Sequence, residues 1–431
     1  MKRLQIQIRE HDKLHIGVFD SAKPSVTLGQ AEELCKLKDI HGFDVFKWIN
    51  QHMLCAQQYV GTIQIGELTV EILPKIESSV GVQSISMIRH NLVGMLMVAL
   101  SLDISEGDIA NTGFQRIGIL EILIRLFCNK LFKQVHGGLV RRYVGQEGNY
   151  PVLRGRLAIT EQVRFNAANP QRLYCRFDEF LEDIALNQIL KAAVRILLKA
   201  SKDLTNQRQL AELLLVFAGI TDVPPSALPW DKISFDRLNE RYRASFLLAK
   251  LFLKGTPPDV TSGRTSGFSL LFDMNTLFEE YIGRMTTRLV RAKGMQVNLQ
   301  GPHRFLARVA SSGRAAFAMK PDIVIAKESK AICIVDTKWK QLTIDESREG
   351  AAQSDLYQMY AYANNYECSD VTLLYPHHVS LGLQPGVRAN YQLNRWVGGH
   401  TSNGIACVKV ATIDLSDLNL VSNQLLALFN L

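Results

Sequence analysis

The chain has 431 residues, 47% of them hydrophobic and 21% charged, which is the composition of a globular protein with room for two or three domains. Its 49 Lys and Arg outnumber its 41 Asp and Glu, which gives a net charge of +8. Where the excess positive charge lies along the chain indicates which region could bind an acidic partner. No uninterrupted apolar run reaches the roughly 18 residues of a membrane-spanning helix, so no membrane association is expected.

Residues 1–125 are expected to form an α+β region that begins with strands and continues with helices. The first two predicted strands are expected to pair with each other, and Gly66-Glu67 to join the last two in a tight hairpin. The predicted strands are residues 4–8, 13–18, 59–65 and 68–76, and the predicted helices are residues 30–38, 43–51, 84–100 and 118–136. This region contains no catalytic pattern.

Residues 126–260 are expected to contain a basic finger and a helical part that docks on a partner. Glycine and aromatic residues recur through residues 137–151, which favours an exposed hairpin or an extended finger. The predicted helices are residues 178–199, 207–218 and 236–252, with a proline-rich connection at 223–229. Linker composition at residues 254–267 places the start of the next domain near residue 261.

Positive charge is concentrated between residues 130 and 176. Glu147 and Glu161 are the only acidic residues in this window, and they face nine basic ones: Lys130, Lys133, Arg141, Arg142, Arg154, Arg156, Arg164, Arg172 and Arg176. Such a stretch fits a polyanion or an acidic protein surface as a partner. A solvated face without a partner is the alternative.

Residues 261–431 are expected to form an α/β domain with a central mixed sheet flanked by helices. The predicted strands lie near residues 295–299, 304–309, 320–326, 331–337, 371–375 and 405–411. The predicted helices are residues 270–291, 355–363 and 416–429. A short polar turn between 326 and 330 joins two of these strands into a hairpin.

Two carboxylates and a lysine gather at one end of this hairpin. Asp322 opens its first strand, and Asp336 and Lys338 lie at the end of the second, two residues apart and so on one side. Paired carboxylates suit Mg²⁺, which activates water and stabilises charge on phosphoryl oxygens. A neighbouring lysine can position that water, so the set is suited to phosphodiester hydrolysis. A hairpin with solvated charges at its ends is the alternative.

The two flanking helices add further polar residues. Glu279 lies in the helix before the hairpin. Gln358 and Tyr362 lie four residues apart in the helix after it and therefore share a face. The alternatives are an exposed helix charge for Glu279 and ordinary helix packing for Gln358 and Tyr362.

The order of these motifs resembles the PD-(D/E)xK nuclease superfamily and its RecB-like branch. More narrowly, "LFDMNTLFEEYI", "KPDIVI", "IVDTKWK" and "DLYQMYAYA" resemble the McrC family, the nuclease subunits of McrBC-type, 5-methylcytosine-dependent restriction systems. The resemblance is densest over residues 268–375 and looser at "VGTIQIGELTVEILPKI", "LRGRL" and "DEFLEDIALNQILK". It implies a C-terminal domain of the restriction-endonuclease-like fold.

The resemblance also implies roles for the polar residues. Asp322 and Asp336 would hold Mg²⁺, with Mn²⁺ as the alternative, and the backbone carbonyl of Val335 or Thr337 would add a ligand. Lys338 would act on the attacking water.

Three helix residues would complete the site. Glu279 would orient the site or add a metal ligand, and Gln358 and Tyr362 would line it beside the DNA backbone. Because no acid precedes Asp336, a second metal would depend on Glu279 or on DNA phosphates.

A partner is implied as well. In this family the N-terminal region docks on a hexameric AAA+ GTPase, McrB, and a projecting part enters the ring and stimulates hydrolysis. Arg141, Arg142, Arg154 or Arg156 would then face the GTPase. The chain has no G-x-x-x-x-G-K-[ST] motif, so it is not expected to bind a nucleotide through a P-loop of its own. Recognition of the modified cytosine would reside in the partner.

The expected function is that of a metal-dependent endodeoxyribonuclease subunit acting on methylated double-stranded DNA together with the GTPase. Two alternatives remain: a subunit that activates the GTPase without cutting, and a stand-alone RecB-like repair nuclease. The seven cysteines form no C-x-x-C pair, and the N-terminus lacks the apolar core of a signal peptide. A cytoplasmic location is therefore expected.

Overall fold

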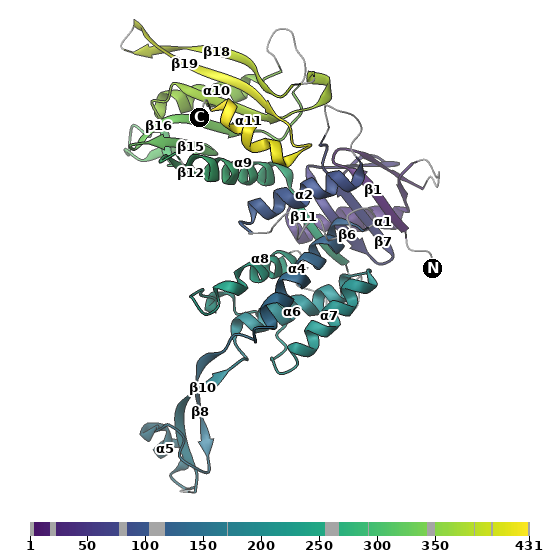
Figure 1. Ribbon diagram of the computed structural model, residues 1–431, viewed down its shortest axis with the longest axis vertical. Coiled ribbons are helices and arrows are strands. Elements are labelled where there is room, and N and C mark those ends of the chain that lie inside the picture. Colours follow the sequence, from purple (N-terminus) through teal and green to yellow (C-terminus); the bar gives the residue numbers. More distant parts are fainter. Residues whose placement is uncertain are drawn as a thin grey trace. The chain divides into compact units, whose positions relative to one another are not determined.

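The computed structural model describes residues 4–17, 23–76, 84–102, 117–169, 171–254, 267–291, 293–342, 350–382, 384–397 and 400–429, with backbone alone for 394–397 and 400–405. The chain divides into two units. Unit 1 comprises Met1–Ile119 and Leu271–Leu431, and unit 2 comprises Leu120–Leu270. Both units contain helices and strands, so the fold is mixed α/β (Figure 1). Nearly all of the predicted linker, 255–266, lies outside the described residues.

Unit 1 begins with two four-stranded sheets, in the orders β1-β7-β6-β11 and β3-β2-β5-β4. As predicted, β6 and β7 form an antiparallel hairpin, and Gly66 in its turn has a φ of +54°, a conformation that favours glycine. The strands are β1 (Leu4–Arg9), β2 (Lys13–Ile16), β3 (Ser25–Val26), β4 (Phe46–Asn50), β5 (Met53–Ala56), β6 (Tyr59–Ile65), β7 (Leu68–Leu73) and β11 (Gly267–Asp273).

Two predictions for this region were wrong. Strand β1 does not pair with β2 but runs parallel to β7, where Ile6 and Ile8 join the core. The backbone N–H of Arg9 donates to the carboxylate of Asp12 in a turn that directs β2 into the other sheet. Residues 43–51 form no helix, and residues 46–50 form strand β4. Apolar spacing alone favours a helix here, but pairing with β5 satisfies the backbone hydrogen bonds as a strand.

The predicted helices at 30–38 and 84–100 are confirmed as α1 (Leu28–His41) and α2 (Ile85–Ala99). A capping box formed by Thr27 and Gln30 starts α1, and Gly42 ends it at a φ of +77°. Ser84 caps α2 by accepting a hydrogen bond from the backbone of Met87. Helix α2 packs against α9 (Met274–Arg291) within unit 1.

Unit 2 holds a slender three-stranded sheet, in the order β8-β10-β9, and a group of helices. The elements are α4 (Ile119–Val135), β8 (Arg142–Tyr150), β9 (Arg156–Leu157), α5 (Ile159–Asn166), β10 (Leu173–Leu181), α6 (Ala185–Ala200), α7 (Leu204–Val216), η1 (Pro225–Ala227), η2 (Trp230–Lys232), η3 (Glu240–Tyr242) and α8 (Arg243–Lys254). We call residues 142–181 the finger. The finger and helices of unit 2 are drawn in blue to green in Figure 1.

The finger departs from its prediction in one respect. Residues 137–151 do not fold back on themselves, because all nine residues of β8 pair antiparallel with β10. The predicted helix at 178–199 therefore begins only at Ala185, and residues 178–181 belong to the strand. The predicted helix at 236–252 likewise begins later, at Arg243, after a short 3₁₀ turn.

The C-terminal part of unit 1 is built on a six-stranded mixed sheet in the order β12-β15-β16-β17-β19-β18, which confirms the predicted mixed sheet. Its strands are β12 (Gln296–Leu299), β15 (Ile323–Lys327), β16 (Lys330–Thr337), β17 (Asp370–Pro376), β18 (Gly386–Val397) and β19 (His400–Ile413). The other elements are β13 (Arg304–Arg308), β14 (Ala315–Met319), α10 (Gln353–Asn365), η4 (Val379–Leu381), η5 (Leu418–Leu420) and α11 (Val421–Leu428). Strands β14 and β18 were not predicted, and residues 270–273 are the end of β11 rather than helix.

Unit 1 joins two regions that the predicted boundaries, 1–125 and 261–431, placed in separate domains. The buried Asn91 of α2 illustrates the connection, since its amide donates to the carbonyls of Leu415 and Ser416. Such non-local contacts leave no signal in composition. No helix in the described part of the chain is long and apolar enough to cross a membrane.

Candidate active site

The β15–β16 hairpin places the two predicted carboxylates at one end of the pair. Ile323 of β15 pairs with Val335 of β16. Asp322, just before β15, and Asp336, near the end of β16, are the next residues beyond this pair and therefore lie close to each other. Asp336 is only 1% exposed, although it is an acid, because β16 lies inside the six-stranded sheet. A carboxylate that is buried to this degree requires partners.

Lys338, Gln358 and Tyr362 are brought together around Asp336. Lys338 Nζ lies 2.6 Å from Asp336 Oδ2. The amide of Gln358, from α10, connects three groups: it donates to Asp336 Oδ1 at 3.3 Å and to Tyr362 Oη at 2.8 Å, and its oxygen accepts from Lys338 at 3.3 Å. The predicted pair four residues apart on this helix therefore faces the carboxylate and the lysine.

Asp322 is held by the residue that follows Asp336. The backbone N–H and the hydroxyl of Thr337 both donate to Asp322 Oδ2, at 2.7 and 2.8 Å. Gln300 makes a second connection, because its backbone N–H donates to the carbonyl of Asp322 at 2.8 Å and its side-chain amide donates to Glu279 at 2.9 Å. Glu279 thus lies on the Asp322 side of the site.

Burial and mutual repulsion perturb the acids of this cluster. Burial, followed by the charge of Asp322, raises the pKa of Asp336 to about 7, against the opposing effect of Lys338. Burial also raises the pKa of Asp322, opposed by the hydrogen bonds from Thr337. Burial and the charge of Asp322 raise the pKa of Glu279. For Lys338, burial favours the neutral form, but attraction to the two aspartates outweighs it and raises the pKa.

The carboxylates fit a hard divalent cation. Asp336 Oδ2 is buried and lies 2.6 Å from the Lys338 ammonium, a contact that uses one of its lone pairs and leaves another for a cation. Two carboxylates that repel each other gain from a positive charge between them. Among the described residues no group of three or more His, Cys, Asp or Glu is arranged to hold a metal. Asp322 and Asp336 would therefore supply the protein carboxylate ligands, with water completing the shell.

Sequence reasoning missed Gln300 and Asp355, and it named Thr337 only as a possible carbonyl ligand. Thr337 and Gln300 hold Asp322 and Glu279 as described above. Asp355, at the start of α10, is buried, accepts from the hydroxyl of Tyr375 at 3.0 Å and pairs with Lys340 at 2.5 Å. Its charge contributes to the raised pKa of Asp336. Asp355 and Lys340 both lie inside quoted motifs, so their position beside Asp336 and Lys338 was a usable signal.

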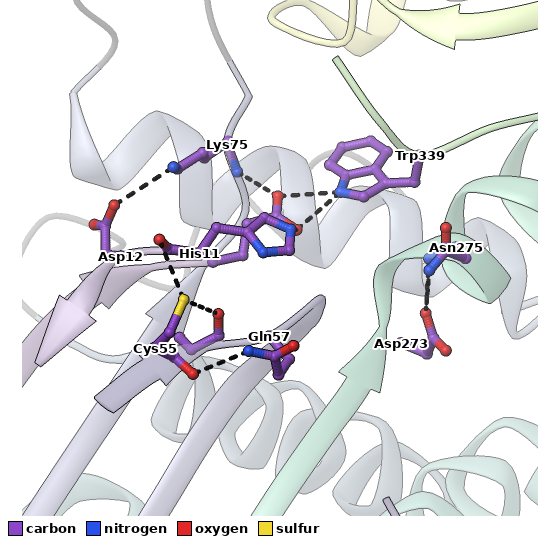
Figure 2. A network of polar contacts seen from close by, with 10 residues as sticks. His11, Asp12, Cys55, Gln57, Lys75, Asp273, Asn275 and Trp339 are labelled. Carbon is purple, nitrogen blue, oxygen red and sulfur yellow. Dashed lines mark hydrogen bonds and ion pairs between the residues drawn. The ribbon is translucent and has the colours of Figure 1, made fainter. Parts of the chain in front are cut away.

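Trp339, the residue after Lys338, anchors the end of β16 to Glu10. Its indole N–H lies 3.0 and 2.9 Å from the two carboxylate oxygens of Glu10, and its ring meets Phe278 edge-on. Glu10 is 1% exposed and also accepts from the backbone of Lys75 at 2.7 Å. Figure 2 labels its two partners, Lys75 and Trp339. The residue next to Lys338 is therefore tied to the N-terminal part of unit 1.

The four arginines proposed to face a partner differ in their surroundings within unit 2. Arg141 pairs with Glu182 at 2.7 Å, and Arg142 pairs with Asp236 at 2.6 Å. The guanidinium of Arg154 lies over the rings of Tyr150 and Phe177, 5.4 and 5.7 Å from their centroids. The Arg156 side chain is exposed and forms no ion pair with any described residue.

The sequence matches one protein-family model, and the fold is similar to those of two solved structures. A family model described as McrBC 5-methylcytosine restriction system component matches residues 54–376. The chain is similar to one in a solved structure of a half-complex from the tetradecameric assembly of Thermococcus gammatolerans McrB AAA+ hexamers with bound McrC. The TM-score is 0.69 at 21% identity, and 99% of each chain is covered.

A second solved structure is the cryo-EM structure of the Thermococcus gammatolerans McrBC complex. Its TM-score is 0.50 at 26% identity, over 66% of this chain and 88% of that chain. No curated protein matches the sequence. The family match covers well over half of the sequence, including the β15–β16 hairpin and α10. This chain therefore belongs to the McrBC family of 5-methylcytosine restriction system components.

Proposed function

We propose that this chain is the Mg²⁺-dependent DNA endonuclease subunit of a 5-methylcytosine-dependent restriction complex, and that its C-terminal sheet with α9 and α10 is a PD-(D/E)xK nuclease domain. The observation that carries the proposal is the cluster of Asp322, Asp336 and Lys338 at one strand end, with Lys338 Nζ 2.6 Å from Asp336 Oδ2. An ion pair at the end of a central strand, beside the half-buried carboxylate of Asp322, supports catalysis more than stability.

Each residue has a distinct task in this proposal. Asp322 and Asp336 would hold Mg²⁺, with Mn²⁺ as the alternative, and a bound metal would supply an acidified water and stabilise charge on the phosphoryl oxygen. Lys338 would orient the attacking water and stabilise negative charge on the phosphate. Gln358 fixes Lys338 relative to Asp336 through its two hydrogen bonds.

Glu279 and Tyr362 would have supporting tasks. Glu279, whose pKa is raised, would orient the Asp322 side of the site through Gln300. Tyr362 is 4% exposed, and its hydroxyl accepts a hydrogen bond from the side-chain amide of Gln358. Tyr362 would therefore hold the Gln358 side chain in its conformation, and Gln358 would line the site beside the DNA backbone.

We further propose that unit 2 docks on an AAA+ GTPase hexamer and stimulates it. A similar chain belongs to a solved half-complex of McrB AAA+ hexamers with bound McrC. The finger carries the features of a docking element: the α5 side chains Ile159 and Val163, four residues apart, are 72% and 66% exposed. The exposed Arg156, three residues before α5, forms no ion pair with any described residue, whereas Arg141 and Arg142 are engaged within unit 2. Arg156 and Arg154 are therefore the better candidates for contact.

Two other functions are distinguished by one experiment. The chain would be combined with an McrB-like GTPase, GTP, Mg²⁺ and plasmid DNA carrying 5-methylcytosine, and each component would be omitted in turn. The proposal predicts cutting only in the full mixture, and a loss of about 10²–10³-fold in Lys338→Ala with GTP turnover retained. Cutting without the GTPase would indicate a stand-alone nuclease. Stimulated GTP turnover without cutting by the wild type would indicate a regulatory subunit.

A further inference from the structure

A second basic stretch leads directly into the candidate active site. Residues 281–321 contain eight Lys and Arg and no Asp or Glu. The part that precedes Asp322 forms the separate two-stranded sheet of β13 and β14, and we call residues 302–320 the arm. The basic residues of the arm are Arg304, Arg308, Arg314 and Lys320.

The arm is fixed at its base to the helix that lines the site. Tyr366, directly after α10, places its hydroxyl 2.5 Å from the carbonyl of Pro302 and 3.3 Å from that of Met319, so one side chain holds both ends of the arm. The guanidinium of Arg304 lies 4.9 Å from the centroid of the same ring. Tyr366 in turn meets Tyr362 edge-on. The base of the arm is therefore connected to α10 through Tyr366 and Tyr362.

Beyond its base the arm is exposed. All five residues of β13 are exposed, and Phe305, Leu306 and Phe317 are 48%, 54% and 74% exposed. Phe317 has a φ of +58°, a conformation that bulky residues rarely adopt and that is found at ligand clamps. A two-stranded sheet with exposed aromatic side chains is marginal in water and gains from a partner that covers it.

The charge of the arm identifies the kind of partner. Within the described part of the chain, no carboxylate pairs with Arg308, Arg314 or Lys320, and Arg308 donates only to the carbonyl of Gly313, at 3.2 Å. Lys320 stands close to the site, since its charge opposes the burial that raises the pKa of Asp322. A basic strip without acids that ends at the catalytic carboxylates is complementary to a phosphate backbone.

We propose that the arm grips double-stranded DNA beside the active site, with Arg308, Arg314 and Lys320 on the phosphate backbone and Phe317 against a groove. This inference rests on the proposed nuclease function and adds the surface that presents the substrate. An acidic surface of the GTPase is the competing occupant. DNA is favoured because the arm continues into Asp322, where the scissile phosphate has to lie.

The test is the salt dependence of DNA binding. The full chain with its GTPase partner would bind a fluorescein-labelled duplex, followed by anisotropy over a series of salt concentrations, with Ca²⁺ replacing Mg²⁺ to suppress cutting. Each lost phosphate contact lowers the slope of log K against log salt by about 0.9, so Arg308→Ala/Arg314→Ala is expected to lower it by about 1.8 and to weaken binding at least about tenfold.

Two further variants sharpen this test. Lys327→Ala/Lys330→Ala removes two exposed charges at the opposite end of the β15–β16 hairpin, and wild-type binding is expected there. Phe317→Ala removes a ring that is 74% exposed and so should leave the fold intact, and it is expected to weaken binding without changing the salt slope.

The outcomes separate the arm from the nuclease. Wild-type DNA binding by Arg308→Ala/Arg314→Ala would overturn the proposal, and a loss of GTPase stimulation in that variant with DNA binding intact would assign the arm to the GTPase. Absence of DNA binding by the wild type would overturn it as well. Failure of the nuclease function alone has a different signature, in which binding depends on the arm but the wild type does not cut.

Discussion

Single residues carry most of the proposed chemistry, and several of them are readable from the sequence. The spacing of Asp336 and Lys338 predicts that both face one side, and their 2.6 Å contact agrees. The pair Gln358 and Tyr362 was predicted to share a helix face and does so. Gln300 could not be found this way, because its contact with Glu279 depends on how β12 ends relative to α9.

Thr337 provides a test of how Asp322 is held. Thr337→Val removes the hydroxyl that donates to Asp322 Oδ2 at 2.8 Å but keeps the backbone donor and the side-chain shape. A hydrogen bond to a charged group contributes about 1.5–3 kcal/mol, so we expect DNA cleavage to fall about tenfold or more and to require more Mg²⁺. Cleavage rates measured across a Mg²⁺ series decide the matter. Thr337→Ser retains the hydroxyl and should behave as the wild type; equal losses in both variants would contradict the assignment.

Glu10 gives a pH-dependent prediction for stability. Burial raises its pKa in the folded protein, against the hydrogen bonds from Lys75 and Trp339. The folded state then binds the proton more tightly than the unfolded state. As pH rises from the ordinary pKa of a glutamate through the raised pKa of Glu10 in the folded protein, the free energy of unfolding therefore falls. Glu10→Gln cannot titrate, and wild type should lose stability relative to it over this range. Thermal unfolding of both proteins across pH is the measurement, and parallel curves would contradict it.

Elements were predictable where a local signal agreed with the tertiary fold. The capped helices α1 and α2, the β6–β7 hairpin and the β15–β16 hairpin are of this kind. Residues 43–51 and 178–181 have patterns that fit helix or strand, and pairing with β5 and β8 selects strand. Strand β18 was missed because its sequence is rich in polar residues and contains no apolar run, although it pairs with β19 along its length.

Gly155 tests the finger as an element. Its φ is +63°, and an added Cβ would lie 2.6 Å from the carbonyl oxygen of Arg176 and from Phe177 Cβ, so Gly155→Ala forces the backbone of β9 and β10 apart. We expect this variant to lose most of its stimulation of the GTPase. In Gly145→Ala, on β8 of the same sheet, the nearest atom to the new Cβ is 3.6 Å away, an ordinary contact. Stimulation should be kept there, and GTP turnover measures both. Normal stimulation by Gly155→Ala would show that the shape of the finger does not matter.

The whole molecule was the hardest to predict. Composition and linker patterns suggest three consecutive domains, whereas residues 1–119 and 271–431 share one unit and residues 120–270 form the other. The contacts that join the ends of the chain, such as the indole of Trp339 on Glu10, span hundreds of residues and follow no periodicity. They also give the N-terminal region a physical link to the strand end that holds Lys338.

The central claim is that this chain cuts DNA with Asp336 while another chain supplies the GTP-driven motor. One measurement tests it: cleavage of 5-methylcytosine plasmid and GTP turnover, recorded in the same reaction, for wild type and Asp336→Asn with an McrB-like GTPase. Asparagine keeps the shape of the buried side chain but removes its charge. The account predicts cutting by the wild type, a loss of at least about 10²-fold in Asp336→Asn, and equal GTP turnover in both. Cutting by Asp336→Asn at the wild-type rate would contradict it.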